Sequence, residues 1–320
     1  MTLDEYVGRV SRLSEFTNAN IDEWFMTVDD CVINALEGLG RAKIPKIPYD
    51  RIVAPIVMGS GNAYHTGVLL FEDRAAFTAT ESTYKGVLDA LGNFAKSGVV
   101  ISASGSKNAG GISEELKRRD IAYRFLITCT KDSEASAFFD GEKIFELPKC
   151  PEPYTYNTST YLGMLLTKYW RKPSEIEAHI RNTVDPILEE RREDIDRASA
   201  FYFMVPNEAE NIKSMFHIKF EELFGRRFGR DIYTPEFADK HATDIVSTDG
   251  ELRVAIGCHG PDLSREDISI PLPDNNPKDY ATLMAVGYYT IGKIQKSRQS
   301  FFRDNVVDWC KARGKSPMVV

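Results

Sequence analysis

The 320-residue sequence is poor in cysteine, and its few cysteines form no pattern. There is no CxxC pair, and no histidine lies at the spacing of a zinc site. An odd number of scattered thiols is typical of reduced side chains that serve in packing. We therefore expect no metal site and no redox cofactor. The five cysteines are Cys31, Cys129, Cys150, Cys258 and Cys310.

Long apolar runs and excess positive charge are also missing. No run approaches the roughly 18 apolar residues that span a bilayer, and the N-terminus lacks the basic and apolar regions of a signal peptide. We therefore expect a cytoplasmic protein. The net charge of −7 and the pI near 5.4 disfavour nucleic acid as a partner, because a phosphate polymer needs a basic face. A small anion can still bind locally.

Such a local anion site is predicted at residues 98–111, GVVISASGSKNAGG. An apolar strand ends there in serines and glycines and runs into a helix that extends to Asp120. The turn offers backbone N–H groups, hydroxyl groups and the positive end of a helix dipole. We call residues 102–107 the cradle and expect it to bind phosphate. The alternative is an ordinary turn, since serine and glycine are common in turns.

The order of apolar and amphipathic segments predicts the fold class. Strands alternate with helices in the first half, which is typical of parallel βαβ units. The pattern returns more weakly after residue 197 and indicates an internal duplication. The predicted strands are 52–58, 73–80, 99–101, 121–129, 200–205, 252–256 and 268–272, with two short β runs in 138–147. The predicted helices are 2–16, 20–40, 83–95, 111–120, 158–170, 173–196, 208–223 and 278–296.

These segments group into an α/β chain of two doubly wound parallel-sheet domains. Three prolines in 148–157 mark the best candidate for a linker. The predicted parts are an N-terminal helical arm at 1–44, a first domain at 45–150, a linker with connecting helices at 151–196, a second domain at 197–296 and a C-terminal tail at 297–320.

The order of short motifs resembles that of the sugar isomerase (SIS) family, in particular its members with two SIS domains in one chain. The resemblance covers most of residues 45–296 and implies a flavodoxin-like fold for each domain. The motifs are GSG at 59–61, Glu81, SASG at 102–105, ITCTKDS at 127–133, IKFEE at 218–222 and the downstream His241.

The resemblance implies a phosphate site in the first domain. Ser102, Ser104 and Gly105 match the family's phosphate-binding loop. Ser106 and Lys107 depart from it, because the family has an acidic or amide residue followed by threonine, so Lys107 replaces a hydroxyl group by a charge. Asn62 or Ala63 stands where the family has a serine that touches the sugar. The remaining candidate sugar-binding residues are Gly59, Ser60 and Gly61.

The resemblance also implies catalytic residues in the second half. Glu222 lies at the position of the family's general base, with Glu221 as the alternative. His241 resembles the ring-opening histidine, although its distance along the chain from Glu222 is longer than usual. Lys315, in the tail KSPMVV, resembles a lysine that reaches the active site in glucosamine-6-phosphate synthase. A separate cluster, Arg226, Arg227 and Arg230, is expected to be a solvated turn.

A carboxylate and an imidazole supply the base and the ring-opening group that aldose–ketose isomerisation through an enediol needs. We therefore expect a homodimeric phosphosugar isomerase, acting on a hexose or amino-hexose 6-phosphate. The enzymatic alternatives are an amino-sugar-phosphate deaminase and a fructosamine-phosphate deglycase. A non-catalytic phosphosugar-binding protein is the alternative from another class.

Overall fold

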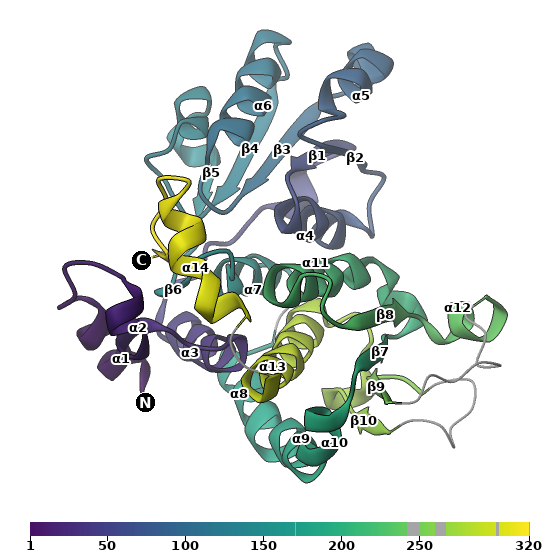
Figure 1. Cartoon of the computed structure of the whole chain (residues 1–320). Coiled ribbons are helices and arrows are strands. Elements are labelled where there is room, and N and C mark those ends of the chain that lie inside the picture. Colours follow the sequence, from purple (N-terminus) through teal and green to yellow (C-terminus); the bar gives the residue numbers. More distant parts are fainter. Residues whose placement is uncertain (170, 242–249, 260–266, 299–300, 320) are drawn as a thin grey trace. The chain divides into compact units, whose positions relative to one another are not determined.

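The computed structural model describes residues 1–169, 171–241, 250–259, 267–298 and 301–319 (Figure 1). The chain divides into two compact units. The first, here called the cradle unit, contains residues 42–149 and 160–170. The second, here called the carboxylate unit, contains residues 1–41, 150–159 and 171–320. No helix in the described part of the chain is both long and apolar enough to cross a membrane.

The cradle unit is built on a five-stranded parallel sheet in the order β2-β1-β3-β4-β5. This is the flavodoxin-like order, in which the first strand lies inside the sheet. Its strands are β1 (Pro55–Gly59), β2 (Phe77–Thr80), β3 (Ser97–Ser102), β4 (Tyr123–Thr128) and β5 (Ile144–Glu146). The helices between them are α4 (Asn62–Phe71), α5 (Tyr84–Leu91) and α6 (Lys107–Arg118).

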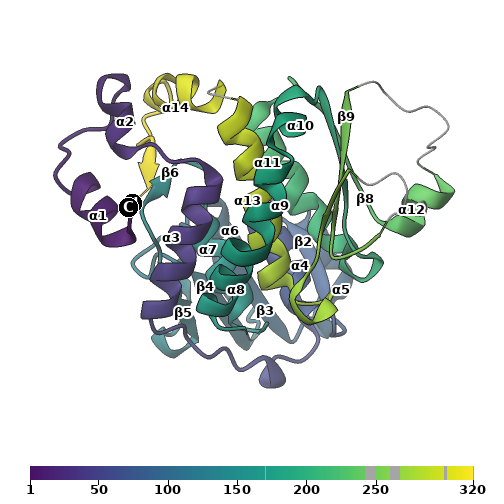
Figure 2. The same ribbon diagram turned by 90° about the horizontal axis from the view of Figure 1, so that it is seen from below.

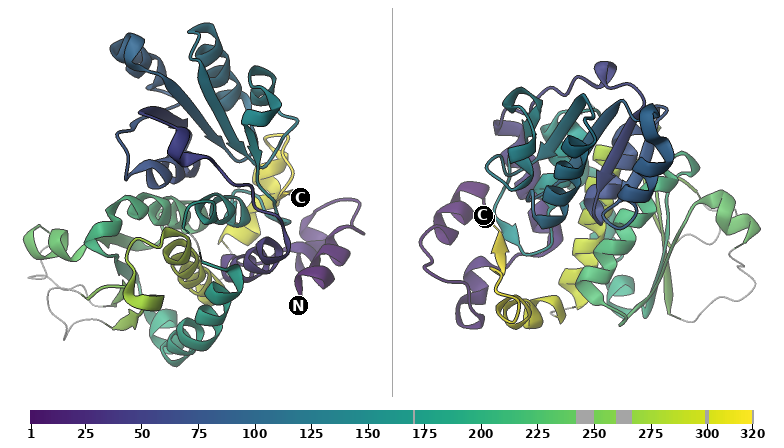
Figure 3. Two further views of the ribbon diagram at one scale, coloured as in Figure 1. Left: turned by 180° about the vertical axis from the view of Figure 1, so that it is seen from behind. Right: turned by 90° about the horizontal axis from the view of Figure 1, so that it is seen from above.

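Both faces of this sheet are covered, which explains the unbroken apolar runs of β1 and β3. Met58 and Val100 belong to a buried cluster with residues of α5 and α6, such as Leu88 and Leu116. The opposite face packs against α4, where a Cβ atom at Gly67 would lie 2.7 Å from Val57 Cγ1. The alternation of side chains along each strand therefore serves two helical layers. Figure 3 shows these strands from behind.

The carboxylate unit contains a four-stranded parallel sheet in the order β10-β9-β7-β8. Its first strand in the chain again lies inside the sheet, so the two sheets begin with the same topology. The strands are β7 (Ala200–Met204), β8 (Gly229–Tyr233), β9 (Glu251–Ile256) and β10 (Ile268–Ile270). The helix α11 (Lys213–Phe224) connects β7 to β8, α12 (Pro235–Lys240) follows β8, and α13 (Tyr280–Arg298) follows β10.

Helices from both ends of the chain pack in this unit. In Figures 1 and 2, α3 runs beside α13 and α8. A Cβ atom at Gly292 of α13 would lie 2.0 Å from the backbone nitrogen of Asp29, so glycine permits this close packing. These helices are α1 (Leu3–Val10), α2 (Ile21–Trp24), α3 (Val28–Arg41), α8 (Pro173–His179), α9 (Asp185–Glu190), α10 (Arg192–Arg197) and α14 (Phe301–Lys311). The helix α7 (Thr158–Leu166) begins in this unit and continues in the other.

The predicted α/β class with parallel sheets is confirmed, but several predicted elements are wrong in extent. The helix expected at 20–40 is interrupted before Val28. The strand expected at 73–80 begins only at Phe77. Residues 138–147 form one strand, β5, because 3-10 turns occupy 135–138 and 141–143. The helix expected at 173–196 is divided by a π-helical segment at 180–184. This segment lies ahead of Pro186, and the ring nitrogen of a proline cannot donate a helical hydrogen bond.

We predict that Glu115 of α6 stabilises the cradle unit in a pH-dependent way. Hydrogen bonds from Arg118, and then from Arg119, lower the pKa of its carboxyl from 4.5 to about 2, although burial opposes the shift. The stabilisation is full above pH 4.5 and is lost as the pH falls towards 2. Glu115→Gln should lower the free energy of unfolding at neutral pH by about 1–2 kcal/mol, because Arg118 is solvent-screened.

Urea unfolding at pH about 7 and about 3 measures this effect, and the deficit should shrink at the lower pH. The exposed neighbour Glu114→Gln is the control. A deficit that stays constant with pH would show that Glu115 does not act through its charge.

Candidate functional site

The predicted phosphate loops follow two neighbouring strands of the cradle unit. β1 and β3 pair directly, while their crossovers lead to opposite sides of the sheet. Ligands of open α/β sheets bind outside the carboxyl ends of the strands at such a switch point. Residues 59–62 follow β1 and begin α4, and residues 102–107 follow β3 and begin α6. The topology therefore places both groups of candidate residues at one crevice.

The cradle has a fixed backbone. Ser102 Oγ accepts a hydrogen bond of 3.0 Å from the N–H of Gly105, which has a φ of +59°. A Cβ atom at Gly105 would lie 2.1 Å from Ser133 Oγ, so this position has no room for a side chain. Ser104 and Ser106 are exposed, and the extended Ser106 precedes the first turn of α6. Lys107 begins the helix, and its side chain lies outside the described part of the chain.

These features suit an anion. The first N–H groups of a helix have no partner within the helix, and α6 presents them behind two exposed hydroxyl groups. Ser106, the N-cap residue, does not use its side chain to cap the helix. The cradle can therefore offer N–H and O–H donors to a phosphate group.

The loop after β1 also requires glycine. A Cβ atom at Gly59 would lie 2.7 Å from the backbone nitrogen of Tyr64. Gly61 has a φ of +53° and precedes α4, with open space around its Cα atom. Ser60 lies between these glycines, and Asn62 is buried at the start of the helix. The GSG motif thus reflects a tight turn from β1 into α4.

The second group of candidate residues lies in the carboxylate unit, around Glu222 of α11. Its Oε1 atom accepts a 2.7 Å hydrogen bond from the hydroxyl group of Thr155. Its Oε2 atom accepts a 2.7 Å hydrogen bond from Lys219 Nζ, one helical turn earlier. A carboxylate has about four acceptor sites, so two remain for a ligand. The side chain of Glu222 is 24% exposed and can be reached from solvent.

Lys219 was not predicted from the sequence, although it fixes this carboxylate. Its side chain has no exposed surface, and Nζ also donates to the backbone oxygens of Tyr156, at 2.8 Å, and Thr155, at 3.3 Å. The ammonium group lies over the rings of Tyr156 and Tyr288. A buried lysine is stable only with such partners, because an isolated buried charge costs several kcal/mol. The sequence feature that could have indicated this pair is the three-residue spacing of Lys219 and Glu222, which puts both on one face of a helix.

The loop that meets this pair has an uncommon backbone. Thr155 has a φ of +71° and Asn157 a φ of +48°. The left-handed region is rare for a β-branched residue such as threonine, and it costs about 1–3 kcal/mol. Residues in such conformations concentrate at functional sites. The strained loop holds the Thr155 hydroxyl group against Glu222.

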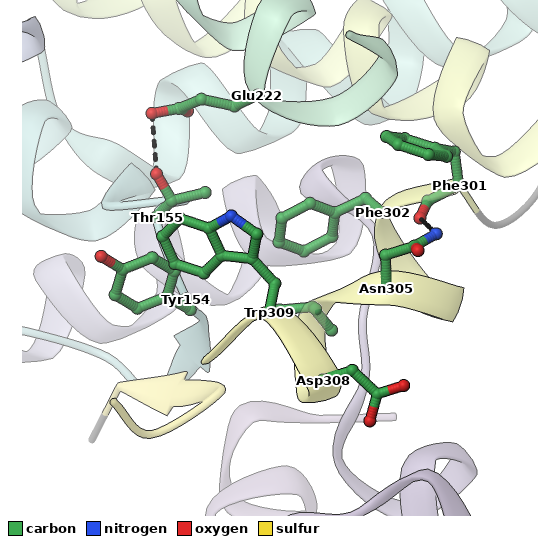
Figure 4. Close-up of a pocket in the computed structure, with 9 residues that line it drawn as sticks. Tyr154, Thr155, Glu222, Phe301, Phe302, Asn305, Asp308 and Trp309 are labelled. Carbon is green, nitrogen blue, oxygen red and sulfur yellow. Dashed lines mark hydrogen bonds between the residues drawn. The ribbon is translucent and has the colours of Figure 1, made fainter. Parts of the chain in front are cut away.

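A cavity of about 570 Å³ opens beside Glu222. Figure 4 shows the carboxylate and Thr155 on one side of it and the aromatic rings of Trp309 and Phe302 on another. Most of the wall comes from α14. The lining residues are Tyr154, Thr155, Glu222, Phe301, Phe302, Asn305, Val306, Asp308 and Trp309. The volume lies within the range of small-molecule pockets.

The C-terminal tail is tied to the same loop. Strand β11 (Met318–Val319) pairs antiparallel with β6 (Glu152–Pro153), directly before Tyr154. Lys315 Nζ donates a 2.5 Å hydrogen bond to the hydroxyl group of Tyr154. Burial raises the pKa of Glu152, which accepts hydrogen bonds from the Thr158 N–H and the Ser159 hydroxyl group. The structure therefore brings Lys315 to the edge of the cavity through Tyr154.

His241 and Glu221 lie elsewhere. His241 follows α12, is exposed and has its ring 5.1 Å from that of Phe237. Figures 1 and 2 show α12 beyond β8, on the opposite side of α11 from α14. Glu221 pairs with Arg230 and lies 3.7 Å from His217. Within this unit, Glu222 lines the cavity and its neighbour Glu221 does not.

The predicted arginine cluster is not simply a solvated turn. Arg230 is largely buried and donates to the Gly225 carbonyl, while Arg227 lies over the ring of Phe301 at 4.3 Å. These contacts brace the end of α11 against α14. Among the described residues, no group of three His, Cys, Asp or Glu side chains is arranged to hold a metal ion.

Comparison with solved structures identifies the fold of the chain. No family model and no curated protein matches the sequence. Among solved structures, a glucosamine-6-phosphate deaminase from Thermotoga maritima has a TM-score of 0.57 at 15% identity, over 91% of this chain and 95% of that one. The C-terminal domain of a glucosamine-fructose-6-phosphate aminotransferase from Francisella tularensis has 0.56 at 13% identity, over 89% and 97%.

A third solved structure, the tagatose-6-phosphate ketose/aldose isomerase from Escherichia coli, has a TM-score of 0.55 at 12% identity, over 92% of this chain and 90% of that one. The chain therefore has the fold of the phosphosugar isomerases, and the fold class implied by the SIS resemblance is confirmed.

We predict that Gly105 is required for the shape of the cradle. Gly105→Ala meets two costs, a left-handed backbone and a clash with Ser133, so it should destabilise the protein by more than about 2 kcal/mol. Gly61→Ala is the control for the backbone cost alone, since Gly61 also has a positive φ but open space around it, and it should cost about 1–3 kcal/mol. Urea unfolding measures both variants.

Adding Ser133→Gly to Gly105→Ala should recover the part of the loss that arises from the clash. Equal stability of Gly105→Ala and the unaltered protein would show that the cradle has another conformation.

Proposed function

We propose that this protein is a phosphosugar aldose–ketose isomerase acting on a hexose or amino-hexose 6-phosphate. The observation that carries the proposal is Glu222, a carboxylate held by Thr155 and Lys219 at the wall of a small-molecule cavity. The cradle unit, taken by itself, supports the proposal because its cradle has donors for a phosphate group at the switch point of the sheet. The fold of the phosphosugar isomerases is consistent with both assignments.

The reaction assigned to Glu222 is proton transfer in the open-chain sugar. The carboxylate removes the proton from C2, and the electron pair of that C–H bond forms the C1=C2 double bond of an enediol as the carbonyl oxygen takes up a proton. The proton from C2 then returns to C1 while the O2 hydroxyl proton leaves, which produces the ketose. No net oxidation occurs, so a base and proton donors suffice.

Contacts of the two glutamates favour Glu222 over Glu221 as the base. Glu221 is already paired with Arg230, whereas Glu222 keeps acceptor capacity at the cavity. Assistance by Lys315 rests on the family resemblance and on its hydrogen bond to Tyr154 at the cavity. Ring opening by His241 rests on the resemblance alone, because within this unit His241 lies away from Glu222. The homodimer stays a prediction.

A deaminase or a deglycase acting on an amino-sugar phosphate is the second candidate. The same base and phosphate site would serve that chemistry, and one of the solved structures with a similar fold is that of a glucosamine-6-phosphate deaminase. The apolar character of the cavity also favours a substrate with a substituent on nitrogen. A binding protein without activity would use the cradle alone.

The first prediction of the proposal concerns phosphate binding. Ser104→Ala removes one exposed hydroxyl donor, so the affinity for a hexose 6-phosphate should fall by about 1.5–3 kcal/mol, the range of a hydrogen bond to a charged group. Titration calorimetry measures the affinity, and the exposed Ser11→Ala is the control. Unchanged affinity in Ser104→Ala and in Ser102→Ala would make the cradle an ordinary turn.

The second prediction concerns the base. Glu222→Gln keeps the shape of the side chain but removes the base, so turnover should fall by about 10²–10⁴-fold while sugar-phosphate binding persists. Exchange of the C2 proton with deuterated water, followed by NMR, reports this step directly. Glu221→Gln is the matched control and should exchange at the unaltered rate. Unchanged exchange in Glu222→Gln would remove this residue from the reaction.

A further inference from the structure

The cavity beside Glu222 is more apolar than a bare sugar requires. Five of its nine lining residues are Tyr154, Phe301, Phe302, Val306 and Trp309. The rings of Tyr154 and Trp309 lie 5.3 Å apart, and Figure 4 shows the ring of Phe302 next to that of Trp309. The wall therefore offers several flat ring faces to a ligand.

The polar groups of this wall are partly engaged with each other. The Thr155 hydroxyl group donates to Glu222, and Asn305 Nδ2 donates to the backbone oxygen of Phe301 at 2.7 Å. A sugar has a hydroxyl group on nearly every carbon, and a hydroxyl group buried without a partner is costly. An apolar group suits this cavity better than a sugar ring does.

The positive charges beside the aromatic wall of the cavity disfavour a cationic ligand group there. Two carboxylates line the cavity: Glu222 is already paired with Lys219, and Asp308 points away from the aromatic rings in Figure 4. Arg313 lies over the ring of Trp309 at 4.0 Å, and Lys315 lies over the rings of Tyr154 and Trp309. A second cation beside these rings would be repelled, so the apolar group that enters should be uncharged.

The position of the cavity beside Glu222 indicates where on the substrate the apolar group is attached. A base that moves a proton between C1 and C2 must lie next to those carbons. The cavity beside Glu222 is therefore expected to hold the substituent that is attached to C1 or C2. An ether link at C1 would lock the sugar as an acetal. A nitrogen link can open to an imine and then form the enamine that proton transfer requires.

From these observations we infer that the substrate is an N-substituted amino-sugar phosphate whose nitrogen carries an uncharged aromatic group, bound between Trp309 and the two phenylalanines of α14. The inference rests on the proposed function, because Glu222 fixes where the cavity meets the sugar. It narrows that function to a substrate class and assigns α14 to substrate selection.

Matched ligands test the inference. The probes are 1-deoxy-1-(benzylamino)-fructose 6-phosphate, its methylamino analogue and its cyclohexylmethylamino analogue, with affinities measured by titration calorimetry. All three carry the same amine and phosphate. The benzylamino compound should bind about ten- to a hundredfold more tightly than the methylamino compound, which is the range expected for burying one aromatic ring.

Two variants locate the effect. Trp309→Ala removes a ring from the wall, and Asn305→Trp fills the cavity from an exposed position. Each should bring the ratio of the benzylamino and methylamino affinities close to one. Because one variant removes bulk and the other adds it, a shared effect identifies the cavity itself. Phe94→Ala, an exposed aromatic residue of the cradle unit, is the control and should leave the ratio unchanged.

The outcomes separate this inference from the proposed function. Equal affinities for the benzylamino and methylamino compounds in the unaltered protein would overturn the inference and leave the proposed function standing. Equal affinities for the benzylamino and cyclohexylmethylamino compounds would overturn the aromatic identity of the group. Binding of none of the three, together with no binding of glucose 6-phosphate or glucosamine 6-phosphate, would overturn the proposed function and the inference with it.

Discussion

The ammonium group of Lys219 is the constraint on which the carboxylate unit's pocket depends. A fully buried cation must have hydrogen-bond acceptors, and here they are two backbone carbonyls of the loop and one oxygen of Glu222. The loop that supplies the carbonyls holds Thr155 and Asn157 in the left-handed region. Relaxing that backbone would withdraw acceptors from Lys219. The strained loop, the buried lysine and the orientation of Glu222 are therefore one arrangement, and none of the three can change alone.

The cradle, in contrast, depends on backbone geometry rather than on the pairing of side chains. Its geometry comes from the backbone: a helix N-terminus, two paired strands whose connections lead to opposite sides of a parallel sheet, and glycines at positions with no room for Cβ. Such a site needs few specific side chains, so Ser106 and Lys107 can depart from the family pattern without removing the N–H groups. The carboxylate pocket relies on side-chain pairing instead. A phosphate site of the kind proposed for the cradle would therefore tolerate sequence change better than the side-chain pairing proposed to position Glu222.

This difference explains what could be predicted from the sequence. The buried strands and the cradle are local in the sequence, so apolar runs such as 52–58 and the SASG motif were enough to predict them. Glu222 was singled out as the candidate base because of the resemblance to the SIS family. Lys219 was missed because a lysine three residues before a glutamate is common on exposed helices, and only the packing of α11 shows that it is buried. The loop 154–157 was interpreted as a linker, since its prolines and polar residues carry no sign of the contact with α11.

The tail supplies most of the cavity wall from a different element than the one that carries Glu222. α14 supplies the aromatic residues, while Glu222, Thr155 and Lys219 come from α11 and the preceding loop. The tail is held by the β6–β11 pair, by the hydrogen bond from Tyr6 to Met318 Sδ and by the ion pair of Arg303 with Asp22. These attachments are not separate from the carboxylate, because β6 directly precedes the loop of Thr155, which binds Glu222, and because Arg227, just after α11, lies over the ring of Phe301 in α14. In the proposed function, proton transfer and substrate choice would therefore lie on different elements of one unit that remain in contact, so a change in α14 is expected to affect both.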